Sequence, residues 1–251
     1  MHTVSLNALF DGRNFGKAPT GDLLIDTGFG RNIAEQFHTM PLMFRAITFY
    51  SLWQPAADQL RAAGYDPQSL QAILLTHSHW DHVSGLPDFP GVPVWVTPEE
   101  HAFIGKSGDM DFCRLFTGIG YEEYGFEGGP YLGFPQSHDV YGDGSIVAVP
   151  AFGHTPGMVI IFVTLASGTR YAFVRDLVYQ LEGITLREER SWFVRKMGAD
   201  EDAAANRVNL LRMIALKERL PEMIIVPAHD MRGFAELPKL SQAGSGTPAS
   251  P

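Results

Sequence analysis

Short apolar runs alternate with amphipathic segments along the chain, and this pattern predicts strands interleaved with helices. The apolar runs are rich in β-branched and aromatic residues and have the length of buried strands rather than of helices. They span residues 23–26, 72–77, 92–97, 145–154, 158–165, 171–176 and 223–229. Because helical patterns lie between them, we expect an α/β or α+β protein with layered sheets.

Helix signals occur at three places between these runs. A helical pattern begins at Pro55, and a second begins at Thr97, where Thr97 and Glu100 have the spacing of a capping box. Residues 200–220 form the clearest amphipathic pattern, and Pro221 ends it.

One further apolar stretch, residues 40–53, predicts a helix with a broad apolar face. It carries Arg45 and is too short to cross a bilayer. We therefore expect it to serve in the core, as a lid or in a subunit contact, which could be that of a homodimer.

Composition sets the scale of the fold. The chain has 251 residues, of which 45% are hydrophobic, enough for one sizeable globular domain. We assign residues 1–240 to a single domain and the small, polar residues 241–251 to a disordered tail.

The formal net charge of −9 disfavours a nucleic-acid partner, because an acidic surface repels phosphate backbones. The N-terminal residues lack the basic and apolar regions of a signal peptide, so a cytoplasmic protein without a membrane partner is expected. Cys113 is the sole cysteine and cannot form an internal disulfide, so it is interpreted as inert packing.

The ends of five predicted strands carry an acid or a histidine. Strand ends at one sheet edge can bring residues that are distant in sequence to one place. The five residues are Asp26, His77, His154, Asp176 and His229.

The segment "THSHWDH", residues 76–82, adds the densest chemistry of the chain. Its His77, His79, Asp81 and His82 form a His-x-His-x-Asp-His pattern. Alternate residues of an extended loop point the same way, so His77 and His79 can hold one ion, while Asp81 and His82 can turn toward a second. Imidazole and carboxylate suit zinc, and also iron or manganese.

With the segments "LLIDTG", "GHTPG", "RD" and "PAH", this pattern resembles the metallo-β-lactamase superfamily across residues 23–229. The resemblance implies an αββα sandwich, with two mixed β-sheets flanked by helices and the metals at one sheet edge. It implies two divalent metal ions, with zinc first and iron or manganese as alternatives. The implied ligands are His77, His79 and His154 for metal one; Asp81, His82 and His229 for metal two; and Asp176 between both.

The same resemblance implies hydrolysis, in which a hydroxide generated between the ions attacks a carbonyl. Asp26 would orient a ligand from behind, and Asp81 could also move the proton for the leaving group. Tyr179, three residues after Asp176, resembles the tyrosine of the lactone-hydrolysing branch, which donates a hydrogen bond to the substrate carbonyl. A packed aromatic residue is the alternative interpretation of Tyr179.

The leading hypothesis is a hydrolase that opens a lactone or cleaves a related carboxylic ester. A glyoxalase II-like thioesterase, a β-lactamase and a metal-binding protein without turnover are alternatives. The aromatic residues of 103–141 favour a wall or lid for a small substrate with an apolar group. Relatives usually have glycine where this chain has Arg175, so the guanidinium should point away from the metals or meet an acid.

Overall fold

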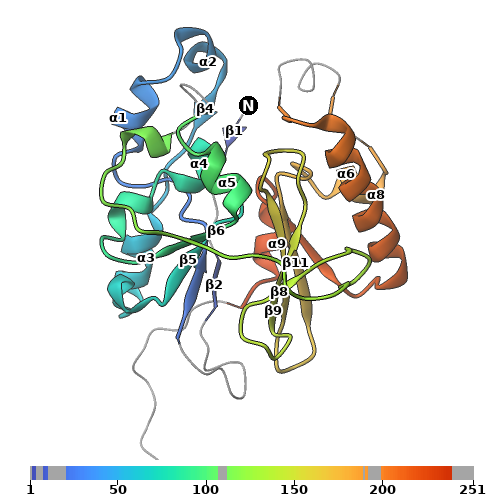
Figure 1. Ribbon diagram of the computed structural model, residues 1–251. Helices are drawn as coiled ribbons and strands as arrows, with labels where there is room; N and C mark the ends of the chain where they lie inside the picture. Colours follow the sequence, from blue (N-terminus) through green and yellow to red (C-terminus); the bar gives the residue numbers. More distant parts are fainter. Residues whose placement is uncertain are drawn as a thin grey trace, which may run out of the picture.

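Two five-stranded β-sheets form the centre of the computed structural model, which describes residues 2–3, 8–10, 21–106, 112–188, 190–191 and 199–238 (Figure 1). Both sheets are mixed. The first has the order β2-β3-β5-β6-β7, and only its β2–β3 pair is antiparallel. Its strands are β2 (Ala8–Phe10), β3 (Leu23–Ile25), β5 (Ala72–Leu74), β6 (Val94–Val96) and β7 (Tyr121–Glu123).

The second sheet has the order β12-β11-β10-β9-β8, and only its β11–β12 pair is parallel. Its strands are β8 (His138–Asp139), β9 (Ile146–Pro150), β10 (Val159–Thr164), β11 (Arg170–Arg175) and β12 (Ile224–Pro227). A separate parallel pair joins β1 (His2–Thr3) to β4 (Phe49–Tyr50).

Helices cover the outer faces of both sheets, with α3 on one side of the molecule and α8 on the other (Figure 1). The α-helices are α1 (Ile33–His38), α2 (Leu42–Ile47), α3 (Ala56–Ala62), α4 (Trp80–Val83), α5 (Pro98–Phe103), α6 (Glu182–Thr185), α8 (Ala203–Arg219) and α9 (Met231–Ala235). Short 3-10 segments occur at Pro67–Ser69, Leu86–Asp88 and Phe112–Leu115.

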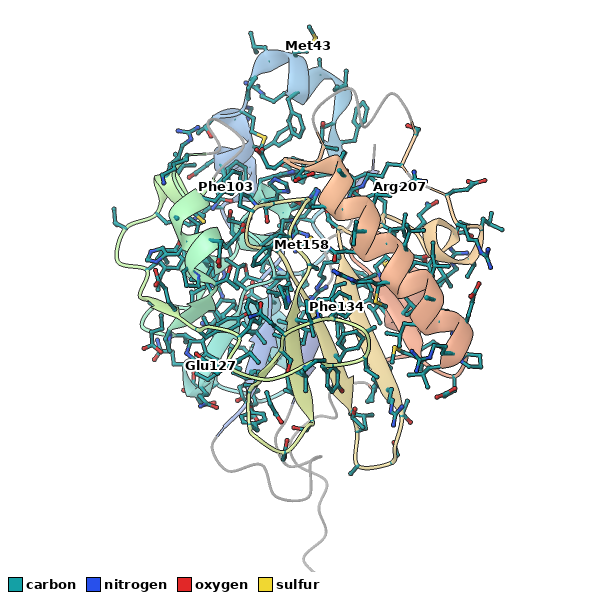
Figure 2. All side chains as sticks on the ribbon, turned by 45° about the vertical axis from the view of Figure 1, so that its right-hand side comes forward. Met43, Phe103, Glu127, Phe134, Met158 and Arg207 are labelled. Atoms are coloured by element: carbon teal, nitrogen blue, oxygen red, sulfur yellow. The ribbon has the colours of Figure 1, made fainter. Side chains whose placement is uncertain are left out.

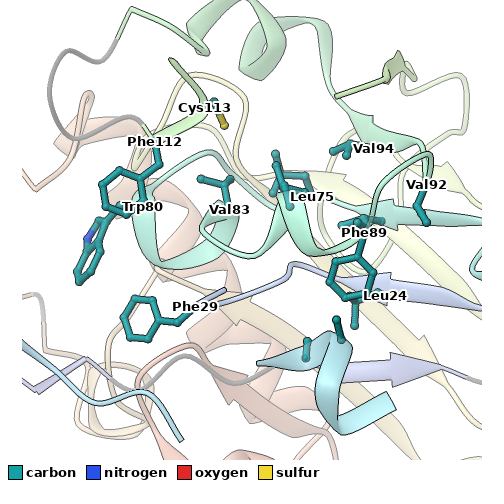
Figure 3. Close-up of a cluster of buried hydrophobic side chains, with 14 of the residues drawn as sticks. Leu24, Phe29, Leu75, Trp80, Val83, Phe89, Val92, Val94, Phe112 and Cys113 are labelled. Atoms are coloured by element: carbon teal, nitrogen blue, oxygen red, sulfur yellow. The ribbon is translucent and has the colours of Figure 1, made fainter. Parts of the chain in front are cut away.

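Alternation along the strands divides the buried apolar side chains into three cores. Successive strand residues point to opposite faces, so Leu23 and Ile25 lie between the sheets in the central core, whereas Leu24 packs under the helices of the first outer core. The first outer core also contains Trp80 and Phe112 (Figure 3). The second outer core packs β9, β10 and β11 against α8. The predicted αββα sandwich is confirmed.

The helix signals at Pro55, Thr97 and 200–220 correspond to α3, α5 and α8. Asp202 caps α8 by accepting hydrogen bonds from the backbone N–H groups of Ala204 and Ala205. Most strands are shorter than the apolar runs predict, because the last residues of several runs have already left the sheet. Among the described residues, we find no helix with the length and apolar character to cross a membrane.

Two expectations for the apolar segments require correction. Residues 40–53 do not form one helix: α2 ends at Ile47, β4 follows, and none of the α2 side chains is buried. Met43, on α2, is 77% exposed at the tip of the molecule (Figure 2). Met40 is nevertheless buried in the first outer core, and Phe44 and Tyr50 pack against that core. The roles of the exposed α2 surface as a lid or in a homodimer stay predictions.

The aromatic residues of 103–141 divide among the three cores instead of forming a single wall. Phe112 lies in the first outer core and Phe134 in the second, while Tyr124 and Phe126 pack against the central core. Cys113 is buried in the first outer core, as expected of packing. The tail expected at 241–251 lies outside the described residues.

Candidate metal centre

Every predicted ligand lies in a loop or short helix that follows a strand. His77 and His79 lie between β5 and α4, and α4 itself carries Asp81 and His82. The three ligand positions further along the chain lie in the loop after β9, directly after β11 and in the turn after β12; they are His154, Asp176 and His229. The parallel and antiparallel order of the strands brings all of these ends to one edge of the sandwich.

The seven side chains form two groups. Within each group, one potential ligand atom from every residue lies within 4.8 Å of those of the other members. The first group contains His77, His79, His154 and Asp176, and the second contains Asp81, His82, Asp176 and His229. Asp176 belongs to both. The structure therefore brings together all seven residues that the sequence pointed to.

Individual distances place Asp176 between the two groups. Its Oδ2 lies 3.4 Å from His154 Nε2, and its Oδ1 lies 3.5 Å from His82 Nε2 and 3.2 Å from His229 Nε2. In the first group, His79 Nδ1 lies 2.8 Å from His154 Nε2, so the two rings present nitrogen atoms to the same point.

In the first group, burial favours the neutral form of the His77 imidazole, which can bind a metal ion through a nitrogen lone pair. Burial, and then the neighbouring histidines His82, His79 and His154, hold the pKa of His77 well below its ordinary value. His77 is therefore neutral, and its Nε2 is buried without a hydrogen-bond partner. A buried polar atom without a partner is costly unless it binds something, and a neutral imidazole nitrogen is a preferred ligand of zinc, iron and manganese. The residues fit a metal ion.

Charge dominates the second group. Burial by itself raises the pKa of Asp176, but His229, together with hydrogen bonds from His154, His229 and His82, holds that pKa well below the ordinary value. Asp176 is thus an anion in the interior. Burial lowers the pKa of His82, but the charge of Asp26 and hydrogen bonds to Asp176 and Asp26 outweigh burial and raise that pKa to about 10.

Asp26 lies next to His82. The carboxylate of Asp26 is 2.8 Å from His82 Nδ1, and it accepts hydrogen bonds from the backbone N–H (2.8 Å) and the hydroxyl (2.7 Å) of Thr76. A carboxylate in this position fixes the ring orientation of a metal-binding histidine. The short "LLIDTG" strand positions Asp26, whose φ of 54° turns the chain away from the sheet.

The Arg175 guanidinium meets an acid, one of the two arrangements expected for it. Its Nε lies 3.1 Å from Asp26 Oδ2, and its Nη2 donates to the carbonyl oxygen of Ile25 at 3.1 Å. The guanidinium lies 5.3 Å from the ring centre of Phe173 and 5.9 Å from that of Phe234. Arg175 therefore pairs with the Asp26 carboxylate, which itself contacts His82.

Tyr179 lies beside the second group. Its ring centre is 5.0 Å from that of His229, with the planes at 90°, and the Arg190 guanidinium lies 4.4 Å from the Tyr179 ring centre. Burial raises the pKa of Tyr179 above its ordinary value near 10, so the phenol is protonated at neutral pH.

Sequence reasoning missed Asp200, which lies behind His154. Asp200 Oδ1 is 3.0 Å from His154 Nδ1 and pairs with Arg190. On the sequence, Asp200 was part of the acidic start of a helix, and nothing local distinguishes it from Glu201 and Asp202. Asp200 reaches His154 because the N-terminus of α8 packs against the loop that carries His154. In this contact, Asp202 N–H donates a hydrogen bond to the Gly153 carbonyl oxygen at 2.7 Å.

Comparison with known proteins identifies the family of the chain. The family model described as Metallo-beta-lactamase superfamily matches residues 17–229. A relative from Mycobacterium tuberculosis named "Probable metallo-hydrolase Rv2300c" is 30% identical over 226 residues, which cover 84% of this chain and 71% of the relative. The N-acyl homoserine lactonase AttM of Agrobacterium fabrum is 27% identical over 135 residues, about half of each chain (51% and 49%).

Solved structures share the fold at low sequence identity. An N-acyl homoserine lactone hydrolase with the product N-hexanoyl-L-homoserine at its metal centre has a TM-score of 0.63 and 18% identity, over 87% of this chain and 80% of that one. AidC, described as a dizinc quorum-quenching lactonase, has a TM-score of 0.57 and 15% identity, over 84% of this chain and 69% of that one.

Proposed function

Because the chain belongs to the metallo-beta-lactamase superfamily, we propose that it is a dinuclear metal-dependent hydrolase that opens a lactone or cleaves a related carboxylic ester. One observation carries this proposal: two buried groups of ligand atoms share the Asp176 carboxylate. A shared anion lowers the repulsion between two neighbouring dications, so the arrangement is suited to a pair of ions rather than to one.

His77, His79 and His154 would hold the first ion; Asp81, His82 and His229 would hold the second; and Asp176 would contact both. When bound, the divalent ions would polarise a carbonyl oxygen and lower the pKa of a water molecule enough for attack at neutral pH. Zinc fits this donor set of imidazole nitrogen and carboxylate oxygen, and iron or manganese fits it as well.

The side chains around the ions would stabilise developing charge, transfer a proton and orient the metal ligands. The Tyr179 phenol would donate a hydrogen bond to the carbonyl oxygen as negative charge develops there. Asp81, whose carboxylate lies 3.5 Å from His229 Nε2, would carry the proton to the leaving oxygen. Asp26 and Asp200 would keep the rings of His82 and His154 in their orientations.

The lactone branch of the proposal is supported by the tyrosine and by the relatives. Tyr179 stands beside His229, where a donor could reach a substrate that the second group holds. AttM and several structural neighbours are named as lactonases of N-acyl homoserine lactones. For this chain we propose the wider class, a lactone or ester with an apolar group.

The test is a hydrolysis panel of lactones, carboxylic esters, thioesters and β-lactams, run on zinc-, manganese- and iron-loaded protein with the metal content measured alongside. We expect lactones to be the fastest substrates. Faster hydrolysis of thioesters or β-lactams would contradict the proposed lactone or ester substrate and assign the enzyme to that other substrate class. Two bound ions without turnover of any substrate would indicate a metal-binding protein that is not an enzyme.

The Tyr179→Phe variant tests the role of the phenol. We expect kcat on the preferred lactone to fall about 100-fold with little change in metal content, because loss of one oxyanion donor costs roughly that much. Tyr141→Phe is the matched control, since the Tyr141 hydroxyl donates to the Gly21 carbonyl at 2.7 Å, away from the metal centre. Equal rates for Tyr179→Phe and the wild type would assign Tyr179 to packing.

A further inference from the structure

Glu100, in the first turn of α5, is a buried carboxylate whose contacts the sequence does not predict. The capping-box pattern predicts that its side chain bonds back to the start of its own helix. One half of the box is present, because the Thr97 hydroxyl accepts a hydrogen bond from Glu100 N–H at 3.2 Å. Glu100 is 1% exposed, and the hydrogen bonds of its carboxylate go to two other loops.

The Oε1 atom of Glu100 binds the loop of the first two histidines. It accepts hydrogen bonds from Ser78 N–H at 2.6 Å and from the Ser78 hydroxyl at 2.7 Å. Ser78 is the residue between His77 and His79, so a shift of Ser78 would move both rings.

The Oε2 atom of Glu100 binds the loop of the third histidine. It accepts hydrogen bonds from the Thr155 hydroxyl at 2.6 Å and from Gly157 N–H at 3.0 Å. Thr155 directly follows His154. The Thr97 hydroxyl adds a bond by donating to the Gly157 carbonyl at 3.0 Å. The start of α5 thus holds both loops at once.

We propose that Glu100 is a positioning residue that sets the spacing of the two loops carrying His77, His79 and His154, and thereby the affinity of the first metal site. The inference rests on the proposed function only for the assignment of these histidines to one ion. Among the described residues, the hydrogen bonds of the Glu100 side chain go to Ser78, Thr155 and Gly157, so we expect little effect on the second site.

Because the Glu100 carboxylate accepts four hydrogen bonds, replacing one of its oxygen atoms by an NH₂ group should disturb the contact with one of the two loops. Burial raises the pKa of Glu100, and the donors from Thr155, Ser78 and Gly157 oppose that rise. An amide in place of the carboxylate would aim an NH₂ group at N–H or O–H donors of one loop. A donor facing donors leaves buried groups unpaired, and that loop would move away.

The experiment measures metal affinity rather than catalysis. His229→Ala protein retains only the first site complete, and His79→Ala protein retains only the second. Zinc dissociation constants are measured in both backgrounds by competition with a chelator. We expect Glu100→Gln to weaken zinc binding about 10- to 100-fold in the His229→Ala background and by less than about threefold in the His79→Ala background.

Two control sets separate positioning from loss of stability. Leu60→Ala opens a cavity in the first outer core, on α3, and should leave both dissociation constants unchanged although it lowers the melting temperature. Thr155→Ser keeps the hydroxyl that donates to Glu100 and should retain the affinity, whereas Thr155→Val should reproduce part of the loss.

The inference is overturned if Glu100→Gln affects both backgrounds equally, if it affects neither, or if Leu60→Ala reproduces its effect. Because no substrate enters the assay, the outcome is independent of the hydrolysis panel. A protein that binds two ions and hydrolyses nothing would remove the proposed function and leave the role of Glu100 intact.

Discussion

At the scale of single residues, Arg175 shows how a buried charge is accommodated beside a metal centre. Its side chain is 1% exposed, and its backbone φ of 45° lies in the region that favours glycine. Arginine pays a conformational cost there that glycine would avoid. The ion pair with Asp26 and the contacts with two phenylalanine rings compensate for that cost.

We predict that Arg175→Met destabilises the protein by about 2 kcal/mol, the usual contribution of a hydrogen-bonded charged group. The Asp26 carboxylate loses its guanidinium partner in this variant and keeps only His82 and Thr76. Methionine keeps most of the side-chain volume and the same backbone strain, so the change isolates the guanidinium. The measurement is urea unfolding of the metal-free protein.

Arg170→Met is the control for this substitution. Arg170 begins the same strand, β11, but it is exposed, and exposed substitutions usually change the free energy of unfolding by less than about 0.5 kcal/mol. Equal unfolding midpoints for the two variants would show that the Arg175–Asp26 pair contributes nothing to stability.

At the scale of elements, the contact between α5 and the loop after β9 depends on the absence of a side chain at Gly157. A Cβ atom at this position would lie 2.2 Å from Glu100 N and 2.4 Å from the Thr97 hydroxyl oxygen. Both belong to the N-terminal turn of α5, which has little room to move because Thr97 and Glu100 are themselves buried. The "GHTPG" motif therefore uses its last glycine for close approach.

We predict that Gly157→Ala costs about 1–3 kcal/mol of unfolding free energy, the usual cost of overpacking a well-filled interior. The loop that carries His154 should also shift, so zinc affinity should fall in the same variant. Thermal unfolding with and without zinc measures both effects.

Gly129→Ala is the matched comparison, since a Cβ atom there would have no atom within 4 Å. It should leave stability and zinc affinity at the wild-type level. If Gly157→Ala behaved like Gly129→Ala, the loop would have freedom that the close approach excludes.

At the scale of the whole molecule, the candidate centre joins both sheets. His77, His79, Asp81 and His82 follow β5 of the first sheet, while His154, Asp176 and His229 follow strands of the second. An ion bound at either group would therefore link the two halves of the sandwich. Bound metal should contribute to global stability as well as to chemistry.

We predict that zinc raises the melting temperature and that a chelator reverses the rise. A ligand at 100 times its dissociation constant stabilises the folded state by about 2.7 kcal/mol per site, which corresponds to about 5–10 °C for a chain of this size. Differential scanning calorimetry is the measurement.

Magnesium at the same concentration is the control, because it prefers oxygen ligands over the imidazole nitrogens that dominate these groups. A melting temperature that does not respond to zinc would contradict metal binding at the centre. An equal response to magnesium would indicate a general effect of divalent salt.

The sequence by itself determined the class of fold and the seven residues that gather at the sheet edge. Apolar runs of strand length and amphipathic segments are local patterns, and so is the His-x-His-x-Asp-His spacing, so these features could be predicted without coordinates. Asp26, Asp176 and His229 were identifiable because each is the last residue of a strand-like run.

Only the tertiary structure decided the partners of buried polar groups. Glu100 had the signature of a helix cap, Asp200 that of an acidic helix start, and Arg175 that of an unfavourable charge, yet each finds its partner in a segment distant in sequence. Residues 40–53 are apolar enough for one core helix, yet only Met40, Phe44 and Tyr50 reach the first outer core, whereas Leu42, Met43 and Trp53 lie exposed. Hydrogen bonds and ion pairs between distant segments form only where the fold brings two loops into contact. Local sequence patterns cannot predict these contacts, because they depend only on residues that are near one another in the chain.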